Sequence, residues 1–293
     1  MNKSKQSINT VSVSAMKMIL GIISIIPLSI LYFISPVLNF FLENIAKYRK
    51  STIKANLINC FVHFDKKEIN KIVADYYKHL SEIIIENLKL FSGSTSSAMN
   101  FSVVNPQILD HYFEDNQDVI LLTGHLGNWE LGFSSSQEYF KHKVIGIYKS
   151  QSNEEFDKYL LGLRKKRGVT LVAERKFVPS VIEDSEYARM FMLIPDQNPK
   201  NNKNVEYFSF LNRRTPFNKS LEKIAKKYSV PVLYADTIKL KRGTYNTRLL
   251  LIYKGKDEDK DVNITAQYVR LLERNIVSNP SIWLWSHKRW KDA

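Results

Sequence analysis

The sequence predicts an α/β protein with a mostly parallel sheet flanked by helices and an N-terminal hydrophobic membrane anchor. Apolar, β-branched runs alternate with amphipathic segments through the middle of the chain, as in βαβ units. Glycine and polar residues directly follow several of these runs, as expected at the carboxyl edge of a parallel sheet. Residues 18–42 contain no charged side chain, which distinguishes the N-terminus from the rest of the chain.

The uncharged N-terminal stretch is long enough to cross a bilayer, which takes about 20 helical residues. Pro27 and Pro36 interrupt it, so we expect a kinked span or two short helices lying partly in the membrane. Lysine and arginine residues flank both ends, and their distribution favours a cytoplasmic location for the following domain. A buried hairpin is the alternative. We therefore expect an anchor at residues 1–46 and one folded domain at residues 47–293.

The net charge and apolar content of the chain limit the classes of molecule that it can be expected to bind. The chain has 293 residues, 44% of them hydrophobic, and a net charge of +14. Such a charge indicates an anionic partner, which can be nucleic acid, a membrane surface or a phosphorylated substrate. The apolar stretch favours the membrane, and we find no recognised nucleic-acid-binding motif. The single Cys60 excludes an intramolecular disulfide and the usual multi-cysteine zinc sites.

Hydrophobic periodicity predicts the elements of the folded domain. Helical spacing covers residues 47–91, and a Gly/Ser-rich loop follows at 92–100. Thr215 and Pro216 are expected as the N-cap and first position of a later helix. Gly243 marks a hairpin. The strands are expected at 119–122, 143–149, 169–173, 189–194, 230–234, 238–241 and 248–252, and the remaining helices at 153–167, 216–228 and 264–277.

The candidate catalytic residues follow the apolar run at 119–122. His125 stands in a glycine-containing turn, and Glu130 comes five positions later. On one continuous helix these side chains would point about 140° apart. They can meet only if His125 lies in the turn and Glu130 in the first turn of the next helix. Strand, turn and helix start then bring an imidazole and a carboxylate together.

This pairing suits proton transfer. A neutral imidazole accepts a proton from a hydroxyl near neutral pH, and a carboxylate on its other nitrogen fixes the tautomer. Backbone N–H groups at Gly127 and Asn128 can hold a developing oxyanion, which makes both candidate substrate-binding residues. The motif contains no serine or cysteine nucleophile, which favours direct attack by a substrate hydroxyl. A buried, merely hydrogen-bonded histidine is the alternative.

Residues 124–130, Gly-His-Leu-Gly-Asn-Trp-Glu, resemble the His-x4-acid motif of the bacterial lipid A biosynthesis (late lauroyl/myristoyl) acyltransferases. Glycerol-phosphate acyltransferases share a His-x4-Asp motif. The resemblance extends, in order, through Arg49 to Phe61, the blocks at 147–156, 194–197 and 210–217, and the terminal signature at 279–290. The chain departs from the pattern in two places: Lys149 replaces an arginine, and 210–217 lacks a glycine.

The resemblance implies transfer of a fatty acyl chain from an acyl-carrier-protein or CoA thioester to a hydroxyl of a lipid A precursor, for lipopolysaccharide synthesis at the inner membrane. It implies no metal or cofactor. His125 would be the base and Glu130 its orienting carboxylate. Asp196, with Arg164 or Lys149, would position the substrate; Gln197 joins this group and Arg167 is a further candidate. In the terminal signature, His287 and Arg289 are expected to be structural.

Three alternatives remain open at this point. The same chemistry can act on a lysophospholipid or aminolipid acceptor. His125 can instead activate water in a membrane-anchored thioesterase or hydrolase. Charge alone is also compatible with a nucleic-acid-binding protein.

Overall fold

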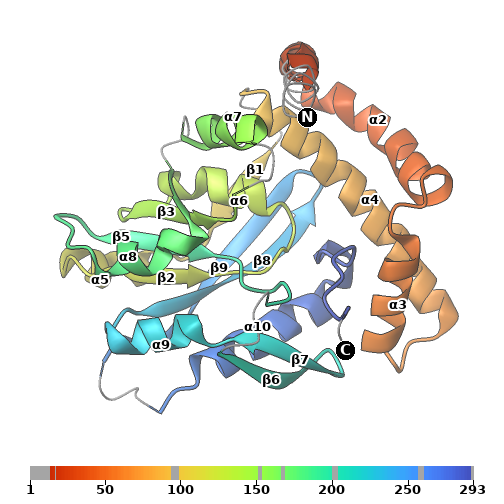
Figure 1. The fold of residues 1–293 in the computed structure, drawn as a ribbon. Helices are drawn as coiled ribbons and strands as arrows, with labels where there is room; N and C mark the ends of the chain where they lie inside the picture. The colour runs from red at the N-terminus through yellow and green to blue at the C-terminus, as the bar shows by residue number, and fades with distance from the viewer. Residues whose placement is uncertain are drawn as a thin grey trace, which may run out of the picture.

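The computed structural model describes most of the chain, namely residues 14–16, 18–93, 99–150, 154–165, 169–199, 204–256 and 261–291. Within these residues a seven-stranded sheet lies at the centre of the protein, in the order β1-β9-β8-β2-β5-β3-β4 (Figure 1). Every neighbouring pair is parallel except β8 and β9. The prediction of a mostly parallel sheet flanked by helices is therefore confirmed. The strands are β1 (Asn100–Val103), β2 (Val119–Leu122), β3 (Lys143–Tyr148), β4 (Thr170–Ala173), β5 (Arg189–Leu193), β8 (Val232–Lys241) and β9 (Thr244–Tyr253).

The sheet is covered on both faces, which explains the apolar runs. In β2, Ile120 and Leu122 belong to one buried cluster, and Val119 and Leu121 belong to another on the opposite face. All four side chains are buried, as expected for a central parallel strand. The helices around the sheet are α3 (Lys50–Cys60), α4 (Lys66–Phe91), α5 (Asp110–Glu114), α6 (Trp129–Ser135), α7 (Glu154–Lys165), α8 (Phe177–Ile182), α9 (Ser220–Lys227) and α10 (Ile264–Ser278).

Helix α4 is the longest of the described helices and runs past one end of the sheet (Figure 1). It begins with a capping box, in which the Asp65 side chain accepts from the Glu68 N–H and the Glu68 side chain accepts from the Asp65 N–H. Its apolar face is buried, whereas His79, Glu82 and Glu86 are buried polar residues that face the β8–β9 hairpin. Helix α4 thus brings several charges into the interior.

The C-terminal tryptophans form a packed seam. Trp283, Trp285 and Trp290 are all buried, and Trp283 packs edge-to-face on Trp285 with ring centroids 4.7 Å apart. Arg49 Nη1 donates to the Ser286 carbonyl, 2.9 Å away. Asn56 Nδ2 donates to the carbonyls of Trp285, at 2.9 Å, and His287, at 3.1 Å. The segment after the apolar N-terminus therefore holds the other end of the chain.

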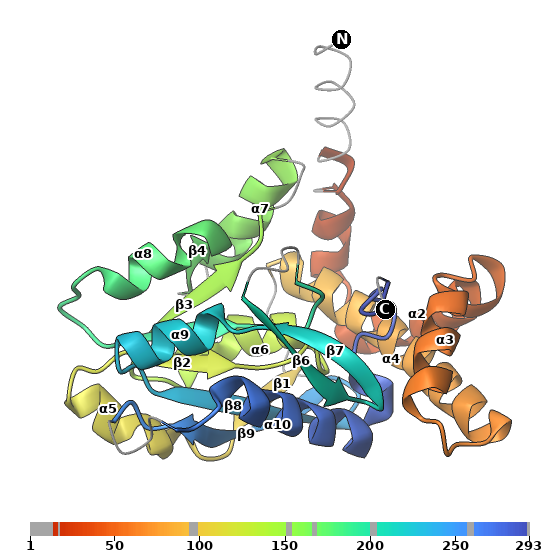
Figure 2. The same cartoon turned by 60° about the horizontal axis from the view of Figure 1, so that its bottom comes forward.

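Pro27 divides the apolar N-terminus into two helices. One covers residues 18–25, and the next is α2 (Leu28–Phe40), followed by a short π-helical turn, Phe41–Ile45. Pro36 lies inside α2 without ending it. In Figure 2 the first helix points away from the sheet, whereas α2 lies beside α4. Residues 28–45 are long and apolar enough to cross a membrane, and they form the one such helix among the described residues.

One expected helix start is wrong. Thr215 and Pro216 lie in strand β7 (Arg213–Asn218), which pairs with β6 (Val205–Phe210) in a separate two-stranded sheet. Leu211 and Asn212, between the strands, both have positive φ, as a tight hairpin requires. A proline fits β7 because an edge strand need not use every backbone N–H. Helix α9 begins only at Ser220.

Candidate active site

His125 and Asp196 meet because they follow neighbouring parallel strands. Leu122, the last residue of β2, pairs in register with Leu193, the last residue of β5. In each case two residues separate the end of the strand from the polar residue, so both side chains arrive at the same edge of the sheet. This edge is the carboxyl end of the parallel strands, where open α/β sheets carry their sites.

The pair is joined by two contacts. His125 Nδ1 lies 2.5 Å from Asp196 Oδ1, and the His125 backbone N–H donates to Asp196 Oδ2 over 2.8 Å. Trp283 Nε1 donates to the same Oδ2 over 2.8 Å. Asp196 therefore holds both the ring and the backbone of His125, and the C-terminal seam holds Asp196.

Asp196 is ionised in this environment. Burial acts to raise the pKa of its carboxyl, but the charge of His125 and the hydrogen bonds from His125 and Trp283 outweigh burial and lower the pKa below its usual value. An ionised Asp196 accepts a hydrogen bond from Nδ1–H of His125, which leaves Nε2 with a lone pair. Nε2 faces the exposed side chain of Gln197, whose Nε2 lies 3.2 Å away. His125 thus presents a proton-accepting nitrogen at the surface of the site.

The turn after His125 is held by the C-terminal segment. Gly127 N–H donates to the Ile282 carbonyl over 3.0 Å, and Leu126 forms an isolated bridge with Trp283. The Gly127 amide is therefore engaged, which corrects the expectation that it holds an oxyanion. Gly127 has φ +57, and a Cβ there would lie 2.9 Å from the Tyr245 ring. The position needs glycine for both reasons.

Glu130 has a different partner from the one expected. Its carboxylate binds Arg164 of α7 through two contacts, from Nη2 at 2.5 Å and from Nε at 3.2 Å. The expected pairing with His125 is replaced because Asp196 holds the ring and backbone of His125 from the neighbouring strand. Glu130 does lie in the first turn of α6, as predicted, and the salt bridge presents a fixed guanidinium beside the site.

The remaining candidates differ in position. Asn128 is buried, and its Oδ1 accepts from the Leu131 N–H as the N-cap of α6, so its side chain is structural. Lys149 is exposed just beyond β3, on the strand next to β5. Gln197 lies at the site through its contact with His125. Arg167 lies outside the described residues.

Sequence reasoning assigned no site role to Trp283. A buried tryptophan is expected to donate its indole N–H to an acceptor, so the sequence could have indicated that Trp283 has a polar partner. Only the fold shows that this acceptor is Asp196. His287 lies close enough to this group for the charges of Asp196 and His125 to affect it, and burial lowers its pKa. Burial likewise lowers the pKa of Arg289 to about 10. Arg289 is buried and donates to the Pro216 carbonyl, in keeping with the expected structural role.

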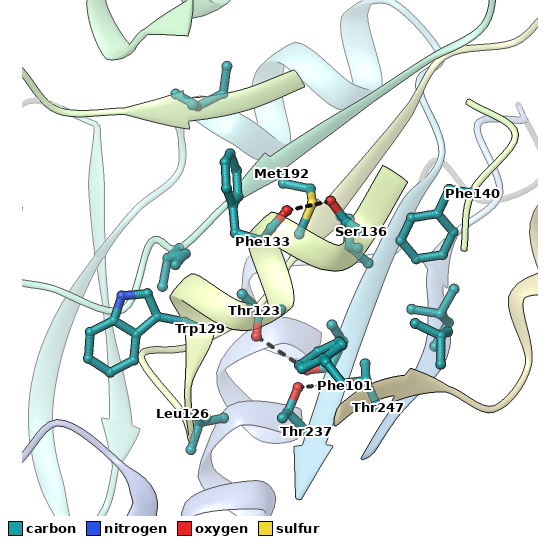
Figure 3. A pocket seen from close by; sticks show the side chains of 17 residues that line it. Phe101, Thr123, Leu126, Trp129, Phe133, Ser136, Phe140, Met192, Thr237 and Thr247 are labelled. Carbon is teal, nitrogen blue, oxygen red and sulfur yellow. Dashed lines mark hydrogen bonds between the residues drawn. The ribbon is translucent and has the colours of Figure 1, made fainter. Parts of the chain in front are cut away.

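An apolar cavity of about 70 Å³ is lined in part by Thr123, Leu126 and Trp129, which lie near His125 along the chain (Figure 3). Leu126 and Trp129 lie at one end of it and Phe140 at the other. The Trp129 ring meets the His125 ring edge-on, with centroids 5.1 Å apart. Most of the wall is apolar, and the side chains between the ends include Leu121, Phe133, Ile147, Met192 and Leu249. The cavity has the lining that a hydrocarbon chain requires.

No group of three or more His, Cys, Asp or Glu side chains in the described part of the chain is arranged to hold a metal ion. Arg164 and Lys149 are the candidate site residues suited to an anionic group, and His125 with Asp196 is suited to moving a proton.

Comparison with known proteins agrees with these features. The family model described as bacterial lipid A biosynthesis acyltransferase matches residues 2–292. A lipid A biosynthesis acyltransferase of Haemophilus influenzae is 23% identical over 251 residues, which cover 84% of this chain and 79% of that protein. The match with the family model spans the apolar N-terminus, the His125 turn and the C-terminal seam. The chain therefore belongs to the bacterial lipid A biosynthesis acyltransferase family and is an acyltransferase.

Proposed function

We propose that the enzyme moves a fatty acyl chain from an acyl-carrier-protein or CoA thioester to a hydroxyl of a lipid A precursor, with His125 as the general base and Asp196 as its orienting carboxylate. The observation that carries this proposal is the His125–Asp196 pair, with the His125 ring in contact with Trp129, which lines an apolar cavity. A base beside a hydrocarbon site is what transfer of an acyl chain to a hydroxyl requires.

The reaction needs one base and no covalent enzyme intermediate. Nε2 of His125 removes the proton of the acceptor hydroxyl as its oxygen attacks the thioester carbonyl. The tetrahedral intermediate then expels the thiolate, which takes the proton back from the imidazolium. Asp196 stabilises the imidazolium between these steps. The Gln197 amide, displaced from Nε2 by the acceptor hydroxyl, remains as a hydrogen-bond donor close to the reacting carbonyl.

The cavity supports an acyl donor. A thioester bound with its carbonyl at His125 would direct its alkyl chain past Trp129 and along α6 toward Phe140. Burying each CH₂ group contributes about 0.8 kcal/mol, so each methylene group that enters the cavity would add to the affinity for the donor.

The charged residues support an anionic acceptor or carrier. The carboxylate of Glu130 fixes Arg164, whose side chain is 15% exposed, so part of the guanidinium remains open to a ligand. Lys149 follows the neighbouring strand end. Both suit phosphate groups, on the acceptor or on the prosthetic group of the carrier.

We also propose that residues 1–46 anchor the enzyme and that residues 47–293 form the acyltransferase domain at the cytoplasmic face of the inner membrane. The apolar helices support the anchor. Thioesters of acyl carrier protein and CoA are hydrophilic donors, so the domain that binds them needs to face an aqueous compartment that contains them.

Acyl transfer by the detergent-purified protein tests the proposal. Labelled acyl-carrier-protein and CoA thioesters would be offered with a panel of acceptors: a lipid A precursor, a lysophospholipid and an aminolipid. We expect label on the sugar lipid, and a loss of 1,000-fold or more in His125→Ala, because general-base catalysis and acceptor alignment are both removed (roughly 10²–10⁴-fold for the base alone). His63→Ala, an exposed histidine between α3 and α4, is the matched control and is expected to retain full activity.

Other results would separate the alternatives. Label on a glycerolipid would keep the mechanism and refute the lipid A acceptor. Release of free fatty acid without an acceptor would indicate a thioesterase. Equal activity of wild type and His125→Ala would refute His125 as the base.

A further inference from the structure

A second buried carboxylate lies behind the active site. Glu86 of α4 is fully buried and accepts four hydrogen bonds: one from α2, one from the N-cap of α6 and two from the β8–β9 hairpin. Oε1 accepts from Tyr32 of α2 at 3.0 Å and from the Gly243 backbone N–H at 3.1 Å. Oε2 accepts from Asn128 Nδ2 and from the Tyr245 hydroxyl, both at 2.9 Å. Burial raises the pKa of this carboxyl, although the hydrogen bonds from Asn128 and Tyr245 act to lower it. A buried carboxyl group with a full set of hydrogen-bond partners is strongly held in place.

Two of these four partners act directly on the turn that carries His125. Asn128 is three residues after His125, and its orientation is fixed because its Oδ1 accepts from the Leu131 N–H. Tyr245 packs its ring against Gly127, which has positive φ and no room for a Cβ. Glu86 therefore reaches Gly127 and Asn128 by two routes, one through an amide and one through an aromatic ring.

We propose that Glu86 is a positioning residue for His125, and that Tyr32 makes α2 part of this positioning network. This inference rests on the proposed function, in which His125 is the base. Glu86 does not touch the reacting atoms. It holds the turn in the one conformation that lets the His125 ring reach both Asp196 and the substrate hydroxyl. The anchor helix then contributes to catalysis through its contact with Glu86 as well as through its apolar surface.

Glu82 provides a matched control on the same helix. It lies about one helical turn from Glu86, is 2% exposed, and binds Lys239 at 2.5 Å and Arg242 at 2.8 Å. These contacts hold the β8–β9 hairpin rather than the turn. A loss of stability should follow from changing either carboxylate, whereas a loss of His125 positioning should follow only from changing Glu86.

Glu86→Gln is the decisive substitution. It keeps the shape of the side chain but directs an amide N–H₂ at either the Gly243 N–H or the Asn128 Nδ2, both of which are donors. Asn128 cannot reverse without losing its cap on Leu131. We expect Glu86→Gln to lower kcat at least tenfold while the KM for the donor thioester stays within twofold. Glu82→Gln, with a similar loss of melting temperature, should keep kcat within twofold.

A reciprocal change tests the contact itself. In the double variant Glu86→Gln/Asn128→Asp, the amide at position 86 donates to the carboxylate at position 128, and aspartate remains a good N-cap for α6. The amide oxygen at position 86 then accepts from Tyr32 and Gly243. We expect this variant to regain most of the lost kcat, although Asn128→Asp alone should be impaired because two carboxylates then face each other.

The link to α2 has its own matched pair. Tyr32→Phe removes the hydroxyl that α2 donates to Glu86, and we expect a three- to tenfold fall in kcat. Tyr77→Phe removes another hydroxyl at the junction with the N-terminal segment, one that donates to the Tyr48 carbonyl over 2.8 Å. It should leave kcat within twofold. If Glu86→Gln does not fold, the comparison of Tyr32→Phe with Tyr77→Phe tests whether the Glu86 network positions His125.

A spectroscopic readout separates failure of this inference from failure of the proposed function. The imidazole ¹⁵N signals of His125, assigned with His125→Ala, should shift in Glu86→Gln and stay in place in Glu82→Gln. Wild type without His125-dependent transfer would refute the proposed function. An unchanged His125 signal in Glu86→Gln, or kcat losses that merely follow the melting temperature in both glutamine variants, would refute the positioning role.

Discussion

His125 takes its partner from the neighbouring strand and not from its own helix. The spacing to Glu130 correctly predicted a strand, a turn and a helix start, and it placed Glu130 in the first helical turn. It could not identify the carboxylate that the ring would meet. Asp196 is 71 residues away along the chain, and only the adjacency and register of β2 and β5 bring it to His125. Strand order is a property of long-range packing, which local periodicity does not contain.

At this scale Asp196→Asn gives a sharp prediction. The His125 backbone N–H and Trp283 Nε1 both donate to Oδ2, so an asparagine would turn its oxygen toward them and its N–H₂ toward Nδ1. Nδ1 must then accept, the proton moves to Nε2, and the base is lost. We expect kcat to fall roughly 100- to 10,000-fold with little change in the KM for the donor. Steady-state kinetics with separate variation of donor and acceptor would measure this.

Glu130→Gln serves as the contrasting variant. Because Glu130 binds Arg164, its change should loosen the guanidinium and chiefly raise the KM for a phosphorylated acceptor. If Glu130→Gln instead lowered kcat as far as Asp196→Asn and left KM unchanged, Glu130 would have to be the orienting carboxylate after all, and the contact seen with Asp196 would not be the catalytic one.

Single elements were predictable where a strong local signal agreed with packing. The apolar run of β2 and the hairpin at Gly243 both lie where the sequence placed them. Thr215 and Pro216 show the opposite case. Their cap-like pattern is equally compatible with an edge strand, and Thr215 is buried against Trp290, whose Nε1 donates to its hydroxyl over 2.8 Å. A tertiary contact at the C-terminal seam decided between the two local structures.

Gly127→Ala tests whether the turn between β2 and α6 requires its observed backbone conformation. The substitution places a Cβ 2.9 Å from the buried Tyr245 ring at φ +57. Left-handed backbone strain and the contact together should destabilise the protein by about 1–3 kcal/mol. The same strain should move His125, so transfer should fall at least tenfold. Thermal unfolding and the transfer assay would record the two effects.

Gly162→Ala is the matched control for this substitution. Gly162 lies in α7, and no atom lies within 4 Å of the place that an alanine methyl group would take. Alanine should therefore raise the stability of the helix by about 0.5–1 kcal/mol and leave transfer unchanged. A stable, fully active Gly127→Ala protein would show that the turn tolerates other conformations, and the geometric requirement placed on it would be wrong.

At the scale of the whole molecule, the N-terminal and C-terminal segments of the domain are hydrogen-bonded to each other. Arg49 and Asn56 donate to the carbonyls of residues 285–287, and residues 282–283, just before them, bind Gly127 and Asp196 at the site. These blocks were recognisable as similar to a family, but their mutual contact was not predictable from either. The active site thus depends on segments more than 200 residues apart, such as Asn56 and Trp285, which are separated by 229 positions. This dependence explains why the resemblance extends far beyond the His125 turn.

The packing of α2 against α4 limits how α2 can contact a membrane. Lys89 donates to the carbonyls of Ile23, Ser24 and Ile26, and Tyr32 donates to Glu86, so α2 runs antiparallel beside the C-terminal part of α4. The N-terminal half of the same helix α4 carries exposed charged residues, including Lys71, Asp75 and Lys78. A helix that lies along a charged, solvated helix cannot cross a bilayer without drawing those charges into it. We therefore expect α2 to lie in the plane of the membrane surface, with its outer face in the lipid.

The exposed side chains of α2 make this testable. Phe33 is 84% exposed and Val37 is 68% exposed, and both belong to the face away from α4. Burying a large apolar side chain contributes about 1.5–3 kcal/mol, so the two changes in Phe33→Ser/Val37→Ser should together weaken binding to anionic vesicles, measured by flotation, roughly 100- to 10,000-fold. Val178→Ser/Ile182→Ser changes two exposed apolar residues of α8, on the opposite side of the molecule (Figure 1), and should not alter flotation.

Equal losses of flotation from both pairs, or no loss from the α2 pair, would contradict an α2 that lies in the plane of the membrane. Protection of positions 33 and 37 from lipid-phase labels would contradict it as well. A transfer rate that falls with flotation when the acceptor is in vesicles, yet stays constant when it is in detergent, would show that this face brings the enzyme to its lipid.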